Sequence, residues 1–240
     1  MVHAFAPISL TAAQTAVENS SFWSLCRLLR AYLHRQSADF HPGMVHLLSP
    51  FVHLYSHGEL SGVSGGAAEA NAYHCFRELM KRLQLVLTFD GAKKMVVTFM
   101  TLLRHTLPEL YSYLEEQQCA GGAWLNSWLQ LLLSKELPLP CLLRLWDSYL
   151  SLHPTKHSGS ASVQEIAASY ETLLQERHVF VCLAILETCN EELMELDDAE
   201  LVWYLHHLPH MDISQVITRA ANLWDDCISR NIVQSLVGLG

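Results

Sequence analysis

Apolar side chains recur every three or four residues along most of this sequence, and this spacing constrains the fold more than any other feature. In the segment Ala70–Leu87 they form a single helical stripe, which consists of Tyr73, Phe76, Met80, Leu83 and Leu87. The alternation of apolar and polar residues that is typical of strands is almost absent. The spacing therefore predicts an all-α protein.

The pattern predicts about nine or ten helices. Asn19 and Ser20 are suitable N-cap residues for a first helix, which carries Phe22, Leu25, Leu29 and Leu33 on one side. The others are expected at Met44–Tyr55, Ala70–Leu87, Ala92–Leu107, a short turn opened by Pro108, Trp124–Leu133, Cys141–Leu152, Val163–Cys189, Asp197–Leu208 and Ile213–Ser229. Two stretches, Gly58–Ala68 and His153–Ser162, are expected to be loops that are too short to separate domains. We therefore predict a single irregular multi-helix domain.

The composition narrows the class of protein. Of the 240 residues, 50% are hydrophobic and 16% are charged, which is typical of a folded globular chain. The net charge of −9 argues against a nucleic-acid partner, because an acidic surface repels phosphate. No apolar run reaches the roughly 18 residues of a membrane span, and the N-terminus lacks the basic and apolar regions of a signal peptide. We expect a cytoplasmic protein.

The cysteines and histidines could suggest a metal site. The seven cysteines are scattered and include no C-x-x-C pair, so packing as free thiols is the better interpretation. Among the 14 histidines, His206/His210 and His153/His157 are spaced four apart, yet no H-E-x-x-H motif accompanies them. We predict no metal site and no cofactor.

Several short motifs go further than the helical pattern. Residues 136–150 read ELPLPCLLRLWDSYL, residues 108–111 read PELY, residues 40–44 read FHPGM and residues 47–50 read LLSP. In this order they resemble the TBC domains of Rab GTPase-activating proteins, where R-x-W-D lies on a helix after a proline-containing turn and Y-x-Q-G-M precedes a helix. The resemblance runs from about Ser21 to about Trp224.

The resemblance implies a domain organisation. Residues 21–230 are expected to form the TBC-like helical domain and residues 231–240 a tail. The opening helices of the family, with their early arginine and tryptophan motif, have no counterpart. Residues 1–20 are then a remnant of the arginine-finger region, and the chain is N-terminally incomplete relative to the family.

The family resemblance also implies a chemistry. TBC proteins supply a Rab with an arginine from I-x-x-D-x-x-R, which neutralises phosphate charge, and a glutamine from Y-x-Q-G, which orients the attacking water. Here Pro42 stands at the glutamine position, and proline has no side-chain donor or acceptor. Residues 8–15 align with the arginine motif and place Gln14, a neutral side chain, at the arginine. No catalytic residue of the family is therefore intact.

Other residues are candidates for binding or structure. The Rab-binding candidates near the altered positions are Arg27, Arg30, Arg35, His41 and Pro42. A solvated helix face is the competing interpretation for the three arginines.

The motif residues Gly43, Arg144, Trp146 and Asp147 are assigned structural roles. Gly43 belongs to the turn, Arg144 and Asp147 are spaced to pair on a helix, and Trp146 is expected in the core.

Three functions remain open. The first is a Rab-binding regulator of vesicle trafficking with little or no GTPase-activating activity, which reaches endomembranes through its partners. The second is an active Rab GTPase-activating protein that uses a non-standard arginine. The third is a helical scaffold that binds no Rab, or an incomplete gene product. In each case we expect no chemistry of the chain's own, since no P-loop, G-x-G-x-x-G or Ser-His-Asp motif occurs.

Overall fold

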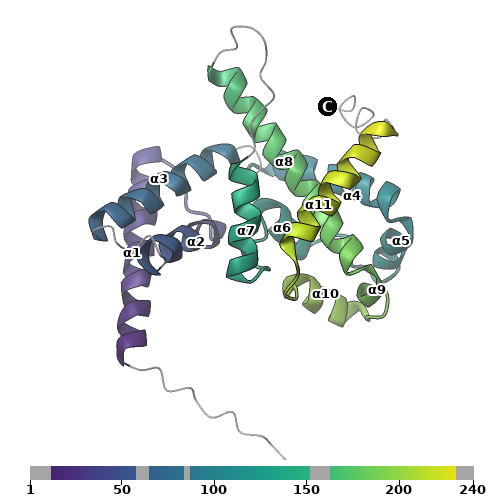
Figure 1. Cartoon of the computed structure of the whole chain (residues 1–240), viewed down its shortest axis with the longest axis horizontal. Helices are drawn as coiled ribbons and strands as arrows, with labels where there is room; N and C mark the ends of the chain where they lie inside the picture. Colours follow the sequence, from purple (N-terminus) through teal and green to yellow (C-terminus); the bar gives the residue numbers. More distant parts are fainter. Residues whose placement is uncertain (1–11, 58–64, 84–86, 152–162, 231–240) are drawn as a thin grey trace, which may run out of the picture. The chain divides into compact units, whose positions relative to one another are not determined.

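The computed structural model describes residues 12–57, 65–83, 87–151 and 163–230. Within these ranges it contains eleven helices and no strand (Figure 1). The description excludes the side chains of residues 12–20, 57, 65 and 163–171. The all-α prediction is confirmed, whereas most of the expected loops at 58–68 and 153–162 and the tail 231–240 lie outside the described residues.

The helices follow the predicted order. They are α1 (Ala12–Gln36), α2 (Gly43–His57), α3 (Gly65–Leu83), α4 (Phe89–Thr106), α5 (Pro108–Glu116), α6 (Ala123–Leu131), α7 (Leu139–Leu150), α8 (Val163–Thr188), α9 (Asn190–Leu193), α10 (Asp198–His206) and α11 (Ile213–Ser229). The helix that the sequence did not predict is α9. Its four residues are too few to show a periodic pattern.

Two expectations about the first helices are wrong. Helix α1 begins at Ala12, so Asn19 and Ser20 lie inside it rather than at its cap. Helix α3 begins at Gly65, within the predicted loop, and residues 84–86, toward its predicted end at Leu87, lie outside the described residues. Burial of Ala68 and Ala72 in α3 offsets the poor helix propensity of the glycines before them.

The buried face of α1 also differs from the predicted stripe. Phe22 is 57% exposed, and between residues 21 and 36 the buried residues are Ser24, Leu28, Leu29 and Tyr32. The predicted stripe overlooked Ser24 because a serine does not count as apolar. Its hydroxyl donates to Glu69 of α3 at 2.7 Å, and this bond allows the polar residue to be buried.

The chain divides into two compact units, Met1–Glu78 and Leu79–Gly240. Unit 1 contains α1, α2 and most of α3, and α1 packs against α2. Its core includes an edge-to-face pair, Tyr32 of α1 and Phe76 of α3, with ring centroids 5.0 Å apart. Helix α1 continues through residue 20, and the domain boundaries at residues 20 and 230 stay predictions.

Unit 2 is built around α8. Every residue from His178 to Leu186 of this helix is buried. Helices α4, α6, α9 and α11 pack against it, and α11 crosses it at an angle (Figure 1). A helix that is apolar on all sides is expected in the centre of a protein rather than at its surface.

Polar side chains fix where several helices of unit 2 begin. Thr88 accepts from Gly91 N–H at the start of α4, and Asp212 accepts from Ser214 N–H at the start of α11. Asp197 and Glu200 form a reciprocal capping box at the start of α10. No helix in the described part of the chain is long and apolar enough to cross a membrane.

Candidate functional site in unit 1

The start of α2 carries the altered glutamine motif. Gly43 N–H donates to His41 Nδ1 at 3.1 Å, and Met44 N–H donates to the His41 carbonyl at 2.9 Å. The imidazole thus satisfies a donor that the first turn of a helix leaves without a partner. The predicted turn into the helix is confirmed, and Pro42 is exposed directly before α2.

Arg27 is held by α3. Its guanidinium donates to the Glu69 carboxylate and, at 3.1 Å, to Ser24 Oγ. The hydrogen bond with Arg27 lowers the pKa of Glu69, which keeps the carboxylate charged. Arg27 therefore links α1 to α3, a role that its position in the sequence did not indicate.

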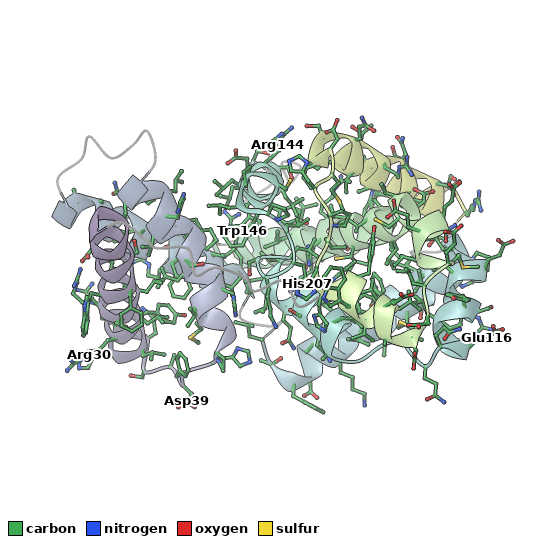
Figure 2. The ribbon with its side chains drawn as sticks, turned by 90° about the horizontal axis from the view of Figure 1, so that it is seen from below. Arg30, Asp39, Glu116, Arg144, Trp146 and His207 are labelled. Atoms are coloured by element: carbon green, nitrogen blue, oxygen red, sulfur yellow. The ribbon has the colours of Figure 1, made fainter. Side chains whose placement is uncertain are left out.

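Arg30 and Arg35 lie further along the exposed side of α1, and Arg30 is labelled in Figure 2. Arg35 lies over the Tyr73 ring, with 5.6 Å between its guanidinium carbon and the ring centroid. Within the described part of the chain, Arg30 makes no hydrogen bond or ion pair with another side chain. Of the three candidate arginines, Arg30 is the most available to a partner.

A shallow, open depression of about 360 Å³ joins these side chains on α1. It is lined by Arg27, Arg30, Ala31, His34 and Arg35. His34 is the residue that our sequence analysis missed. The signal was present, because a residue four after Arg30 shares its face of a helix.

The two altered catalytic positions are not brought together. Gln14 lies in the first turn of α1, and Pro42 follows the opposite end of that helix. At 1.5 Å per residue, α1 separates Gln14 from Gln36 by about 33 Å. The six residues that lead on to Pro42 span at most about 20 Å. The side chain of Gln14 and residues 8–11 of the aligned motif are outside the described residues.

The R-x-W-D residues lie on α7 in unit 2. Trp146 is buried, as expected, and its indole Nε1–H donates to the carbonyl of Leu132 at 3.1 Å. Leu132 ends α6 with φ of 50°, in the left-handed region. Trp146 therefore fixes the end of α6 from the neighbouring helix.

Arg144, which is labelled in Figure 2, and Asp147 are both exposed. The described residues contain no ion pair between them, so the expected pairing is wrong. Both side chains are in solvent, where an ion pair gains little electrostatic energy and loses side-chain entropy when it forms.

We expect Trp146→Phe to lower the free energy of unfolding by about 1–2 kcal/mol, because the Leu132 carbonyl loses its indole donor and the smaller ring loses part of the packing. Urea unfolding followed by circular dichroism measures this loss. Trp224→Phe is the control, since no hydrogen bond from its indole N–H is found among the described residues. An equal loss in the two variants would rule out the hydrogen bond as the cause.

The described residues contain no group of three or more His, Cys, Asp or Glu side chains that could hold a metal ion. His153 and His157 lie outside those residues. Unit 1 therefore offers a basic helix face that leads to the turn at Pro42. A surface of this kind suits the recognition of another protein.

A comparison with known proteins finds solved structures of similar fold. The crystal structure of the Ypt/Rab-GAP domain of Gyp1p matches with a TM-score of 0.67 and 22% identity, covering 85% of this chain and 66% of that chain. This likeness shows the fold.

Two curated relatives match over a shorter range. Mouse TBC1 domain family member 13 is 29% identical over 164 residues, which cover 66% of this chain and 36% of that protein. Human TBC1 domain family member 22A is 28% identical over 163 residues, covering 65% of this chain and 28% of that protein. The matched region thus spans about a third of each relative.

A protein-family model also matches most of the chain. The sequence model of the Rab-GTPase-TBC domain matches residues 18–194, which include the turn at Pro42 and the α7 motif. The fold, the order of the motifs and this match agree, and the chain belongs to the TBC domain family.

Proposed function

We propose that this chain binds a Rab-type GTPase through the exposed face of unit 1 and adds little or no GTPase activation. The observation that carries the proposal is Pro42, exposed at the start of α2 in a member of the TBC family. A bound Rab would bring the chain to endomembranes and to vesicle trafficking.

The lack of activation follows from the chemistry at two positions. Pro42 has no side-chain amide, so it cannot orient a water toward the γ-phosphate. Gln14 carries no charge and lies far along α1 from Pro42. A supplied arginine raises the hydrolysis rate by roughly 10³–10⁵, and a neutral side chain provides none of that electrostatic stabilisation.

Binding needs only surface complementarity, which the basic face of α1 offers. Arg30, His34 and Arg35 are exposed there, whereas the Arg27 guanidinium is already paired with Glu69. Arginine is enriched among residues that dominate binding energy at protein interfaces. We therefore expect Arg30 to contribute most among the α1 arginines.

The binding test measures the affinity of the chain for a panel of Rab proteins in both nucleotide states. We expect at least one GTP-loaded Rab to bind, and Arg30→Glu to weaken that binding by about tenfold or more. Arg144→Glu, which makes the same change on an exposed residue of α7, is expected to leave the affinity unchanged. If a folded chain binds no Rab in either state, the helical scaffold becomes the better hypothesis.

Single-turnover GTP hydrolysis by the bound Rab separates the two Rab-dependent functions. The proposal expects less than about tenfold acceleration, well below the roughly 10³-fold or more of a supplied arginine. Acceleration in that higher range, lost in Arg30→Ala, would show that Arg30 acts as an unconventional finger and that the chain is an active activator.

A further inference from the structure

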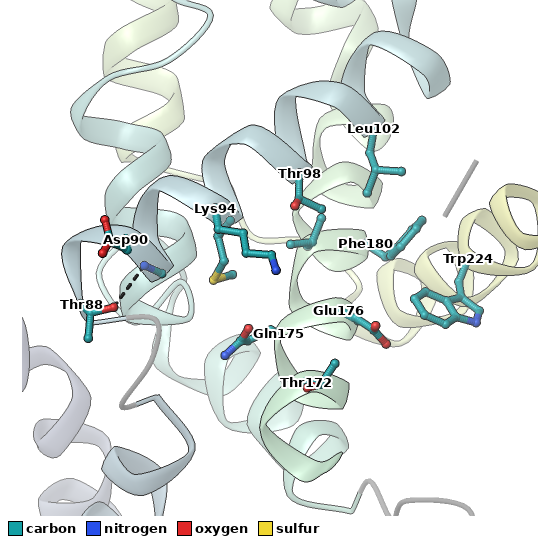
Figure 3. Close-up of a pocket in the computed structure, with 13 residues that line it drawn as sticks. Thr88, Asp90, Lys94, Thr98, Leu102, Thr172, Gln175, Glu176, Phe180 and Trp224 are labelled. Carbon is teal, nitrogen blue, oxygen red and sulfur yellow. Dashed lines mark hydrogen bonds between the residues drawn. The ribbon is translucent and has the colours of Figure 1, made fainter. Parts of the chain in front are cut away.

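Unit 2 contains a cavity of about 570 Å³ between α4 and α8, closed at one side by Trp224 of α11 (Figure 3). One face of α4, including Lys94, Thr98 and Leu102, forms the first wall. One face of α8, including Glu176 and Phe180, forms the second. The volume lies in the range of about 300–1,000 Å³ that is typical of small-molecule sites.

The cavity has an apolar floor and a polar opening. The floor consists of Met95, Leu102, Val179 and Phe180, all of them buried. Trp224 extends this floor, because its ring packs edge-to-face on Phe180 with centroids 5.1 Å apart. Exposed Thr88, Asp90, Lys94 and Thr172 lie at the opening. A ligand with an apolar body and one polar end would match both parts.

The charged side chains around the cavity indicate whether the polar end of a ligand should be positive or negative. Asp90 and Lys94 are exposed at the opening and carry opposite charges, so together they add no net charge there. Glu176 is left on the other wall, half-buried, with no hydrogen bond or ion pair to another described residue. Burial raises the pKa of Glu176, and the charge of Arg177 only partly opposes this shift.

Arg177 does not occupy the cavity opening. Its guanidinium lies over the Trp224 ring, 5.2 Å from the centroid. In Figure 3 the Glu176 carboxylate extends toward Trp224, and the Lys94 side chain extends from α4 into the space between the two helices. A half-buried carboxylate beside an apolar surface is stabilised by a cation that brings its own apolar group.

We propose that this cavity binds a small organic cation, with its ammonium group at the Glu176 carboxylate and its apolar body on Met95, Phe180 and Trp224. The site lies within unit 2, whereas the proposed Rab-binding residues belong to unit 1. Either proposal can therefore fail without the other.

The ligand test uses three eight-carbon probes that differ only in their polar end: n-octylammonium, n-octanoate and n-octanol. Isothermal titration at pH 7.5, below the concentration at which the probes aggregate, measures each affinity. We expect saturable 1:1 binding of n-octylammonium at least about tenfold tighter than that of the other two probes, a difference of about 1.4 kcal/mol. Equal affinities, or no saturable binding by the folded chain, would overturn the proposal.

Two variants locate the site. Glu176→Gln is expected to weaken n-octylammonium binding by about tenfold while leaving n-octanol binding unchanged. Thr98→Phe, which adds a ring at the wall of the cavity, is expected to weaken all three probes. Glu116→Gln, the same change at an exposed residue of α5, is the matched control (Figure 2). If Glu176→Gln and Glu116→Gln retain the same affinity for n-octylammonium, the cation does not bind at Glu176.

Discussion

Trp128→Ala is expected to lower the free energy of unfolding of unit 2 by about 3–5 kcal/mol, the range for truncating a large buried aromatic side chain. Trp128 of α6 is fully buried, and its Nε1–H donates to the Leu205 carbonyl of α10 at 2.8 Å. Its ring packs edge-to-face on Trp124, with centroids 5.0 Å apart. The substitution therefore leaves a cavity and a carbonyl without its donor. Because domains are stable by only about 5–15 kcal/mol, this loss is a large fraction of the total.

Urea unfolding of the purified chain measures the loss, provided that the signal reports on unit 2. Trp203→Ala is the matched control, because Trp203 is 63% exposed on α10, where its ring stacks on His207. Removal of an exposed ring is expected to change stability by less than about 1 kcal/mol. Similar losses in the two variants would contradict the central position of Trp128 in the core.

Stability is expected to fall between pH 6.5 and pH 4 because of His178. This residue of α8 is completely buried, and burial lowers its pKa to about 4. Its Nε2–H donates to the Trp128 carbonyl at 2.7 Å, and its Nδ1 accepts from the Tyr149 hydroxyl at 2.8 Å. The bond at Nδ1 requires the neutral imidazole, because a protonated Nδ1 has no lone pair with which to accept.

The direction of this pH dependence follows from the difference in proton binding between the folded and the unfolded chain. The unfolded chain, with a histidine pKa of about 6.5, binds a proton at His178 before the folded chain does. The stabilisation is therefore complete above pH 6.5 and is lost as the pH falls to about 4, with a total on the order of 3 kcal/mol.

Free energies of unfolding at half-unit steps of pH test this expectation. His178→Gln serves as the comparison, since its amide can still donate to the Trp128 carbonyl but does not titrate. The variant should be less stable at pH 7 and lose less stability than the wild type between pH 6.5 and 4. Protonation of Glu136 changes stability in the opposite direction, because burial raises the pKa of its carboxyl. This contribution is the same in the wild type and in His178→Gln. Identical pH profiles would show that His178 is not the titrating group.

The candidate site was only partly predictable from sequence. The turn at Pro42 could be predicted because proline, glycine and a following apolar run define a helix start locally. The pairing of Arg27 with Glu69 could not, since the two residues are 42 positions apart and each alone is typical of a solvated helix face. His34 was within reach of the sequence, as its spacing from Arg30 follows from helix geometry alone.

Helix type, order and many boundaries were determined by the sequence itself. Helix α11 spans Ile213–Ser229 in both the prediction and the structure, because its apolar spacing and the Asp212 cap are local signals. The tertiary structure decided which face of each helix is buried. Ser24 became a core position through Glu69, and Glu176 became a half-buried carboxylate beside a cavity between α4 and α8. Periodicity describes the spacing within one helix, whereas burial and charge at a site depend on the segments that pack against it.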